Sequence, residues 1–221
     1  MTVPAWELKS KEALKAFLKK NTKALQALIA RDAVEADTRT FVTDLMVEGL
    51  GFDKYDELTA EYLVKGQFAD LGVRVEKKLL AFVEIKRVST ELKEQHLRQV
   101  KAYAADDGVE WVILTNGRIW ECYHVSNTTP LEVHLLFQVD LLDDSTISQK
   151  VEKLWQIGRE GLKRNVLTSL WKSQSALQDE VIEHALVSPP VVAAVRAEIR
   201  RKTGQLVDLE KLKVALRQLL G

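Results

Sequence analysis

The sequence lacks several features that assign many chains to a class at once. It has one cysteine, Cys122, among 221 residues, so it forms no internal disulfide and no multi-cysteine zinc site. No G-x-x-x-x-G-K-[ST] sequence occurs, so an ATP-driven motor is not expected in this chain. A zinc or thiol enzyme is not expected either, because no H-x-x-x-H or similar ligand spacing links the histidines, which are His96, His124, His134 and His184.

Long apolar runs are also missing. No stretch of about 18 uninterrupted apolar residues occurs, as an ordinary membrane-spanning helix would require. The lysine-rich start of the sequence, MTVPAWELKSKEALKAFLKK, has no apolar segment of signal-peptide length. Together with the single cysteine, this predicts a cytoplasmic protein that does not use a membrane.

The formal net charge is zero, but the two signs are unevenly distributed. Residues 34–149 carry 12 basic and 21 acidic side chains, whereas residues 1–33 carry 7 and 3, and residues 150–221 carry 13 and 8. An acidic centre between basic flanks suits a metal site approached by a polyanion such as DNA. Solvated helix faces would give the same distribution, so charge alone does not decide.

Helical and strand-like patterns alternate along the first two thirds of the chain. Apolar residues recur at three- and four-residue spacing from Ser10 to Leu28, from about Asp37 to Leu50 and from Glu91 to Ala105, which predicts helices. The predicted strands are Leu58–Val64, Gln67–Val75, Leu79–Lys86, Glu110–Thr115 and Arg118–His124, and a further apolar stretch covers Val133–Leu142.

This order of elements predicts an α/β fold with a mixed central β-sheet flanked by helices. The helix at residues 91–105 is long enough to cross over between parallel strands, and Asn116–Gly117 between apolar runs predicts a hairpin. Three parts are predicted: an N-terminal amphipathic helix at residues 1–33, a core at 34–145 and a helical C-terminal region at 146–221.

A carboxylate and a lysine interrupt the apolar run LLAFVEIK. Side chains alternate faces along a strand, so Glu84 and Lys86 are same-face neighbours, and a meander can bring Asp70 beside Glu84. Two carboxylates can hold a hard cation that activates water, while Lys86 positions that water or stabilises charge on a phosphate. An E-x-K triplet alone has little weight, because strand ends in solvent often carry mixed charges. Charges inside an apolar run are tolerated mainly when they are paired or metal-bound.

Five segments between Glu35 and Tyr123 resemble a known family when they are taken in order. The segments are EADTRTFVTDLMVEGLGFD (35–53), EYLVKGQFADLGV (61–73), LLAFVEIKR (79–87), QVKAY (99–103) and VILTNGRIWECY (112–123). In this order they resemble the N-terminal nuclease domain of type I restriction enzyme R subunits and its stand-alone relatives, within the PD-(D/E)XK nuclease superfamily. Ala69 stands where the superfamily name has proline, a position without a chemical role.

The resemblance implies a restriction-endonuclease-like core and a Mg²⁺-dependent deoxyribonuclease, with Mn²⁺ as a substitute. It implies Glu35, Asp70 and Glu84 as metal ligands, with Glu48 as the alternative to Glu35. The Q-x-x-x-Y element falls on Gln99 and Tyr103, whose spacing of four places them on one helix face. The implied catalytic residues are Asp70, Glu84, Lys86, Gln99 and Tyr103.

Two further groups of residues have more than one interpretation. Arg39 and Thr38 could hold a phosphate or a carboxylate, or else Thr38 or Asp37 caps the helix that begins there. Trp120 and Tyr123 fit core or cross-strand packing better than stacking on a base.

The tail contains two amphipathic helices, Val191–Lys202 and Asp208–Leu220, with breaks at Ser188–Pro190 and Thr203–Gly204. Its apolar stripe packs within the monomer or against another subunit. A basic face toward DNA, or a merely solvated face, would be formed by Arg196, Arg200 and Arg201.

The sequence thus predicts a metal-dependent DNA nuclease that acts in restriction, DNA defence or repair. DNA is the predicted partner, with a homodimer or a separate motor or specificity subunit as further possibilities. The alternative is a catalytically silent module of the nuclease fold that binds nucleic acid or a protein. Residues 1–30 and 150–221 lie outside the resemblance.

Overall fold

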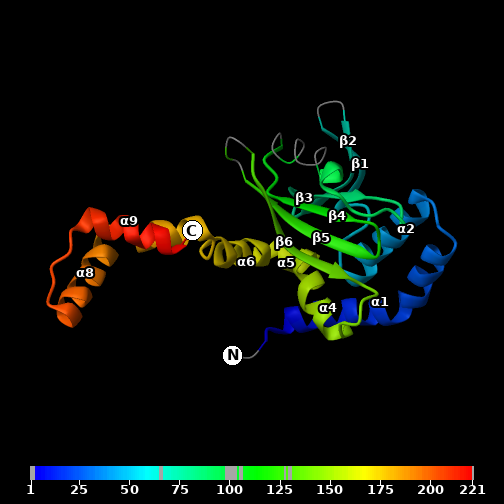
Figure 1. Ribbon diagram of the computed structural model, residues 1–221. Coiled ribbons are helices and arrows are strands. Elements are labelled where there is room, and N and C mark those ends of the chain that lie inside the picture. The colour runs from blue at the N-terminus through cyan, green and yellow to red at the C-terminus, as the bar shows by residue number, and fades with distance from the viewer. Residues whose placement is uncertain are drawn as a thin grey trace. The chain divides into compact units, whose positions relative to one another are not determined.

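In the computed structural model the chain forms two compact units, Met1–Thr168 and Ser169–Gly221. The first contains a β-sheet with helices around it, and the second is helical (Figure 1). Within the described part of the chain, no helix has both the length and the apolar character needed to cross a bilayer. The structure describes residues 3–64, 67–97, 104, 107–126, 128 and 131–220.

The sheet of the first unit has six strands that lie side by side in chain order. They are β1 (Leu58–Val64), β2 (Gln67–Val75), β3 (Lys78–Ile85), β4 (Trp111–Thr115), β5 (Ile119–Val125) and β6 (Val133–Asp140). β3 and β4 run parallel, and each other neighbouring pair is antiparallel. A parallel pair requires a crossover, and residues 94–97 of this crossover are helical. The predicted α/β class with a mixed sheet is therefore confirmed.

The turns of the sheet follow from local chemistry. Between β2 and β3, Glu76 and Lys77 have φ angles of 52° and 69°, and between β4 and β5, Gly117 has a φ of 81°. Glycine adopts this left-handed backbone conformation without the steric cost that other residues bear. The side chain of Asn116 closes the second turn by accepting the backbone N–H groups of Arg118 at 3.1 Å and Ile119 at 2.7 Å. The hairpin predicted at Asn116–Gly117 is thus present.

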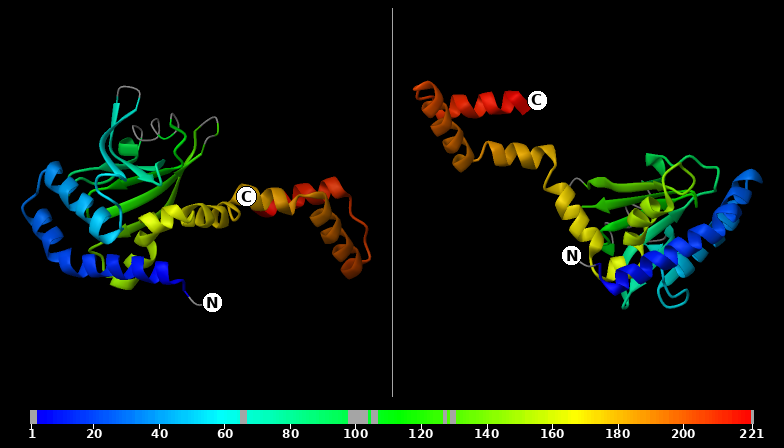
Figure 2. Two further views of the ribbon diagram at one scale, coloured as in Figure 1. Left: turned by 180° about the vertical axis from the view of Figure 1, so that it is seen from behind. Right: turned by 90° about the horizontal axis from the view of Figure 1, so that it is seen from below.

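Helices cover one face of this sheet. α1 (Ala5–Ala30), α2 (Glu35–Asp44) and α4 (Ile147–Leu154) lie on the same side of it, as the views of Figures 1 and 2 agree. α2 continues into a short π-helical turn, η1 (Leu45–Gly49), which packs against α1. A Cβ atom at Gly49 would lie 3.3 Å from Leu14 of α1, so glycine permits this close approach. The unit is completed by η2 (Trp155–Ile157) and α5 (Arg159–Lys163).

Apolar side chains also pack on the face of the sheet opposite to these helices, and this group is called the second apolar cluster, the first being the core between the sheet and the helices. Phe82 of β3 and Val112 of β4 pack there with Leu97 of the crossover segment.

Trp120 and Cys122 of β5 are also fully buried within the unit. The indole N–H of Trp120 donates to the carbonyl of Gly117 at 3.1 Å, so Trp120 is a core residue, as predicted.

The second unit begins within α6 (Val166–Ser175) and contains α7 (Asp179–Leu186), α8 (Pro189–Thr203) and α9 (Leu209–Leu220). The predicted breaks are present, because Ser188 is the N-cap of α8 and Gly204 ends it with a φ of 72°. Val192 of α8 and Leu212 of α9 are buried, whereas Leu219 is exposed. The guanidinium of Arg201 is paired with Glu198 of its own helix.

Candidate functional site

The candidate site lies where the β2–β3 ladder ends. The last register pair of these strands is Leu71 with Val83, and just beyond it one carboxylate oxygen of Asp70 accepts the backbone N–H of Ile85 at 2.8 Å. On the other side of β2, the register with β1 pairs Ala60 and then Tyr62, without a pair at Glu61. The Asp70 side chain therefore accepts a backbone N–H of β3 beyond the last backbone pair of the two strands. This hydrogen bond fixes the position of the Asp70 carboxylate.

Glu84 and Lys86 lie next to Asp70 along β3 and just after it. The Lys86 ammonium donates to the Glu84 carboxylate at 2.5 Å, as expected for same-face neighbours on a strand. Glu84 is only 5% exposed, and it stands beside Leu114 of β4 on the face that carries the second apolar cluster. A buried carboxylate with an ammonium partner is thus built into the end of this strand.

Burial and charge act in opposite directions on these two groups. Burial raises the pKa of Glu84, the hydrogen bond from Lys86 lowers it, and the nearby negative charge of Asp70 raises it further, with a net upward shift. For Lys86, burial alone would lower the pKa. The hydrogen bond to Glu84 and the charges of Glu84, Asp70 and Glu35 outweigh burial, so the pKa of Lys86 is raised and its ammonium stays charged. The two shifts agree that Asp70 and Glu35 act electrostatically on this pair.

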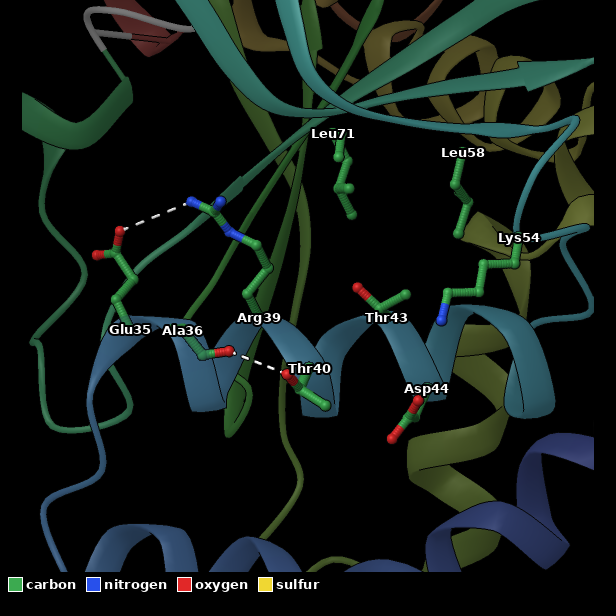
Figure 3. Close-up of a pocket in the computed structure, with 10 residues that line it drawn as sticks. Glu35, Ala36, Arg39, Thr40, Thr43, Asp44, Lys54, Leu58 and Leu71 are labelled. Carbon is green, nitrogen blue, oxygen red and sulfur yellow. Dashed lines mark hydrogen bonds and ion pairs between the residues drawn. The ribbon is translucent and has the colours of Figure 1, made fainter.

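Arg39 of α2 is the cation that faces Asp70. Its guanidinium donates to the second carboxylate oxygen of Asp70. The same group lies 3.7 Å from a carboxylate oxygen of Glu61 and 4.0 Å from one of Glu35, a contact visible in Figure 3. Arg39 thus holds carboxylates here, one of the two roles that the sequence predicted for it.

Thr38 connects α2 to the segment that follows β3. Its hydroxyl accepts the backbone N–H of Val88 at 3.1 Å, and the residue is fully buried. The N-cap of α2 is Val34, which makes no capping side-chain bond, so neither Thr38 nor Asp37 caps this helix. The alternative in which one of them is the cap is wrong because α2 begins two residues before the predicted start. Thr38 instead fixes the helix that carries Glu35 and Arg39 against the strand that carries Glu84.

The other residues predicted for the site are placed differently. Glu48, the alternative to Glu35, lies on η1, and its carboxylate is 3.4 Å from the ammonium of Lys20 on α1. Gln99 and Tyr103 lie outside the described residues. The structure thus brings Glu35, Asp70, Glu84 and Lys86 into one neighbourhood.

Two neighbours of the site, Glu61 and His96, were not predicted from the sequence. Glu61 has a φ of 49°, rare for a residue with a side chain, and pairs with Arg39 at the break in the β1–β2 register. His96 lies close enough to Lys86 that, after burial, the ammonium charge helps to lower the pKa of the imidazole. No spacing rule signals either residue, because both reach the site through the fold.

Carboxylate oxygens are the ligands that Mg²⁺ prefers, and Asp70 and Glu84 supply them in one place. The donor type therefore fits a hard divalent cation. Within the described ranges, however, no three His, Cys, Asp or Glu side chains are grouped so that they could hold a metal ion. Asp70 is paired with Arg39 and Glu84 with Lys86, so each carboxylate already has a side-chain cation.

The fold and the site define an α/β domain with a mixed sheet and a cation-paired acidic cluster where neighbouring strands separate. Residues 35–136 match the family model of the type I restriction enzyme R protein N terminus (HSDR_N). This segment, a little under half of the chain, is therefore related to that N-terminal domain, as the sequence predicted. Searches of curated proteins and of solved structures found no significant match.

Proposed function

We propose that this chain is a Mg²⁺-dependent nuclease that hydrolyses phosphodiester bonds of DNA, with Mn²⁺ as a substitute ion, in restriction or in DNA defence or repair. Its location would be the cytoplasm. Any translocation would come from a separate motor subunit, because this sequence has no phosphate-binding loop of an ATPase. A second copy or a specificity subunit is a further proposed partner.

One observation carries the proposal. The Asp70 carboxylate accepts the backbone N–H of Ile85, the residue that separates buried Glu84 from Lys86 in the sequence, and the Lys86 ammonium is charged. Structural ion pairs are usually exposed, whereas the pair of Glu84 and Lys86 interrupts a buried strand. Perturbed pKa values concentrate at functional sites, and the match of residues 35–136 to a restriction enzyme family supports the same assignment.

The residues of the chain have separable roles in this proposal. Asp70, Glu84 and, from α2, Glu35 would hold the cation, which when bound would lower the pKa of a coordinated water and neutralise charge on the phosphate. Lys86, charged throughout the neutral range, would orient that water or stabilise the negative charge that develops on the phosphate oxygens. Gln99 and Tyr103 would position the strand or Lys86.

Cleavage assays test the proposal directly. The purified protein would be incubated with linear, circular, single-stranded and methylated DNA in the presence of Mn²⁺, and the products separated on gels. Glu84→Gln and Lys86→Met should each lower the cleavage rate by at least about a hundredfold. Glu12→Gln and Lys15→Met are matched controls, because this ion pair lies on the surface of α1 and, among the described residues, contacts none of Asp70, Glu84 and Lys86. Cleavage at the parental rate by either site variant would contradict the assignment.

A second candidate function has a specific observation in its favour. Because Asp70 and Glu84 are both ion-paired, the chain could be a catalytically silent module that keeps the fold and binds nucleic acid or a protein. Calorimetry with Mg²⁺ or Mn²⁺, with and without DNA, distinguishes the two. If the parent binds the ion and Glu84→Gln abolishes this binding, the nuclease is supported. If the parent binds no ion either with or without DNA, the silent module is supported.

A further inference from the structure

Three acidic side chains surround the guanidinium of Arg39. Asp70 is hydrogen-bonded to it, Glu61 lies at 3.7 Å and Glu35 at 4.0 Å. Two of these acids, Asp70 and Glu35, are among the proposed metal ligands. Arg39 therefore occupies the electrostatic position that a metal ion would need, between carboxylates that would otherwise repel one another.

The Asp70 carboxylate has a partner on each oxygen. One accepts from Arg39, and the other accepts from the backbone of Ile85 at 2.8 Å. The backbone contact belongs to the sheet and can persist, since a carboxylate oxygen can accept more than one contact. A dication at the same carboxylate would repel the guanidinium of Arg39, because both are positive. A metal ion at Asp70 therefore competes with Arg39 for this carboxylate and favours release of the guanidinium.

A place for the displaced group exists beside it. Arg39 lines a pocket of about 540 Å³ between α2 and the first two strands (Figure 3). Across this pocket the side chain of Lys54 extends toward α2, next to Thr43. The Nε atom of Arg39 is buried and has no hydrogen-bond partner in its present position. A buried donor without an acceptor is unfavourable in free energy, so a rearrangement that gives the guanidinium an additional acceptor would be favoured.

The chemistry of that acceptor follows from the donors. A guanidinium presents a planar fork that matches two oxygens of a phosphate, and a lysine adds a point charge. Arg39 and Lys54 line the same pocket, with the hydroxyl-bearing Thr40 and Thr43 on the helix between them, and the acids Glu35 and Asp44 line it as well. A metal ion held by Glu35 and Asp70 would offset the charge of Glu35, so the pocket would suit a phosphodiester group of DNA once the ion is bound.

We propose that Arg39 is a stand-in cation at Asp70 that a divalent metal ion releases, and that the released guanidinium, together with Lys54, binds a DNA phosphate. This rests on the proposed metal-dependent nuclease and adds that the metal ion binds before Arg39 can bind the DNA phosphate. Metal binding and DNA binding become coupled, because the same arginine cannot serve Asp70 and the phosphate at once.

Arg39→Met tests the first half, because methionine keeps the aliphatic length and removes the charge. Calorimetric titration with Mn²⁺ in the absence of DNA should give about tenfold tighter binding to this variant than to the parent, since the ion no longer competes with a charged hydrogen bond. Arg31→Met is the matched control. Arg31 is also positive and close to α2, but it pairs with exposed Asp37 at 3.0 Å, so its removal should leave Mn²⁺ affinity unchanged.

DNA affinity tests the second half. Fluorescence anisotropy with a labelled duplex, in Ca²⁺ and in EDTA, measures how much a divalent ion strengthens DNA binding. The parent and Arg31→Met should bind DNA more tightly in Ca²⁺, whereas Arg39→Met should lose this gain and Lys54→Met should reduce it. Circular dichroism melting of each variant verifies that it is folded.

The outcomes separate this inference from the proposed function. Tighter Mn²⁺ binding by Arg39→Met with loss of the metal-dependent gain in DNA affinity supports it. Equal or weaker Mn²⁺ binding by Arg39→Met, while the parent binds the ion, overturns the inference and leaves the metal-dependent nuclease standing. Failure of both proteins to bind Mn²⁺ overturns the inference together with the metal site.

Discussion

Asp70 of β2 accepts the backbone N–H of Ile85 of β3 at 2.8 Å, so a candidate metal ligand also completes the hydrogen bonding of the sheet. Asp70→Ala would leave that N–H and the Arg39 guanidinium without their acceptor. We predict a loss of about 1–3 kcal/mol in the free energy of unfolding, measured with urea. Asp37→Ala removes an acid of α2 that is paired only with the exposed side chain of Arg31 among the described residues, and should change stability by no more than about 0.5 kcal/mol. An equal free energy of unfolding for Asp70→Ala and the parent would show that the Asp70 side chain does not stabilise the fold.

The Glu84–Lys86 pair should respond asymmetrically to substitution. Lys86→Met leaves a carboxylate with 7% side-chain exposure without its cation, and we predict a destabilisation of up to about 3 kcal/mol at pH 7. Glu84→Gln removes the buried charge and leaves the more accessible ammonium, which is 22% exposed, so its effect should be smaller.

The double variant Glu84→Gln, Lys86→Met should recover stability relative to Lys86→Met alone, because neither charge then remains unpaired. Thermal and urea unfolding of the four proteins form a double-mutant cycle. Strictly additive losses would mean that the 2.5 Å contact carries no coupling energy.

Thr38 offers a test of how α2 is fixed against the strand that bears Glu84. Thr38→Val keeps the shape of the side chain but removes the acceptor of the buried Val88 N–H, and should cost about 1–3 kcal/mol. Thr40→Val on the exposed side of the same helix is the control, since the Thr40 hydroxyl only donates to the carbonyl of Ala36. If both variants unfold at the same urea concentration as the parent, the contact with Val88 contributes nothing to stability.

Acid should weaken the contact between Arg118 and Asp140, which joins the start of β5 to the end of β6. Burial would raise the pKa of Asp140, but the hydrogen bonds from Arg118 and from the Leu142 backbone outweigh it, so the pKa is lowered. A carboxyl group whose pKa is lowered by folding stabilises the protein above its unfolded value, about 3.9, and loses this effect as the pH falls through the folded value.

Arg118→Met should therefore cost about 1 kcal/mol near pH 6, and the difference from the parent should shrink between about pH 5 and pH 3. Urea unfolding at several pH values measures this. Asp140→Asn should unfold with a weaker pH dependence than the parent over the same range. A difference between Arg118→Met and the parent that stays constant down to pH 3 would contradict the assignment to Asp140.

Much of the sheet could be predicted because its strands carry local signals. β1 and β2 have the predicted bounds, and the hairpin turn at Asn116–Gly117 was signalled by its residues. The strand β6 was predicted only as an apolar stretch. Leu135 and Leu136 are neighbours of which the first is 51% exposed and the second buried, so the usual alternation of polar and apolar residues is hidden.

The site could be predicted less fully, for a physical reason. Strand alternation is enough to place Lys86 beside Glu84, and a meander is enough to place Asp70 near them. Pairing of Arg39 with Asp70 depends on where α2 lies against the sheet, which no local spacing encodes. The sequence indicates only that Arg39 shares a helix face with Glu35, because the two residues are four apart.

The burial of Cys122, a residue of β5, determines where the protein can be labelled. The thiol is fully buried, and burial raises its pKa, so little reactive thiolate forms at neutral pH. Maleimide and iodoacetamide reagents should therefore leave the native protein unmodified. Lys54→Cys, at an exposed position in the lining of the pocket, would provide the sole accessible attachment point for a fluorophore or spin label, without prior removal of Cys122.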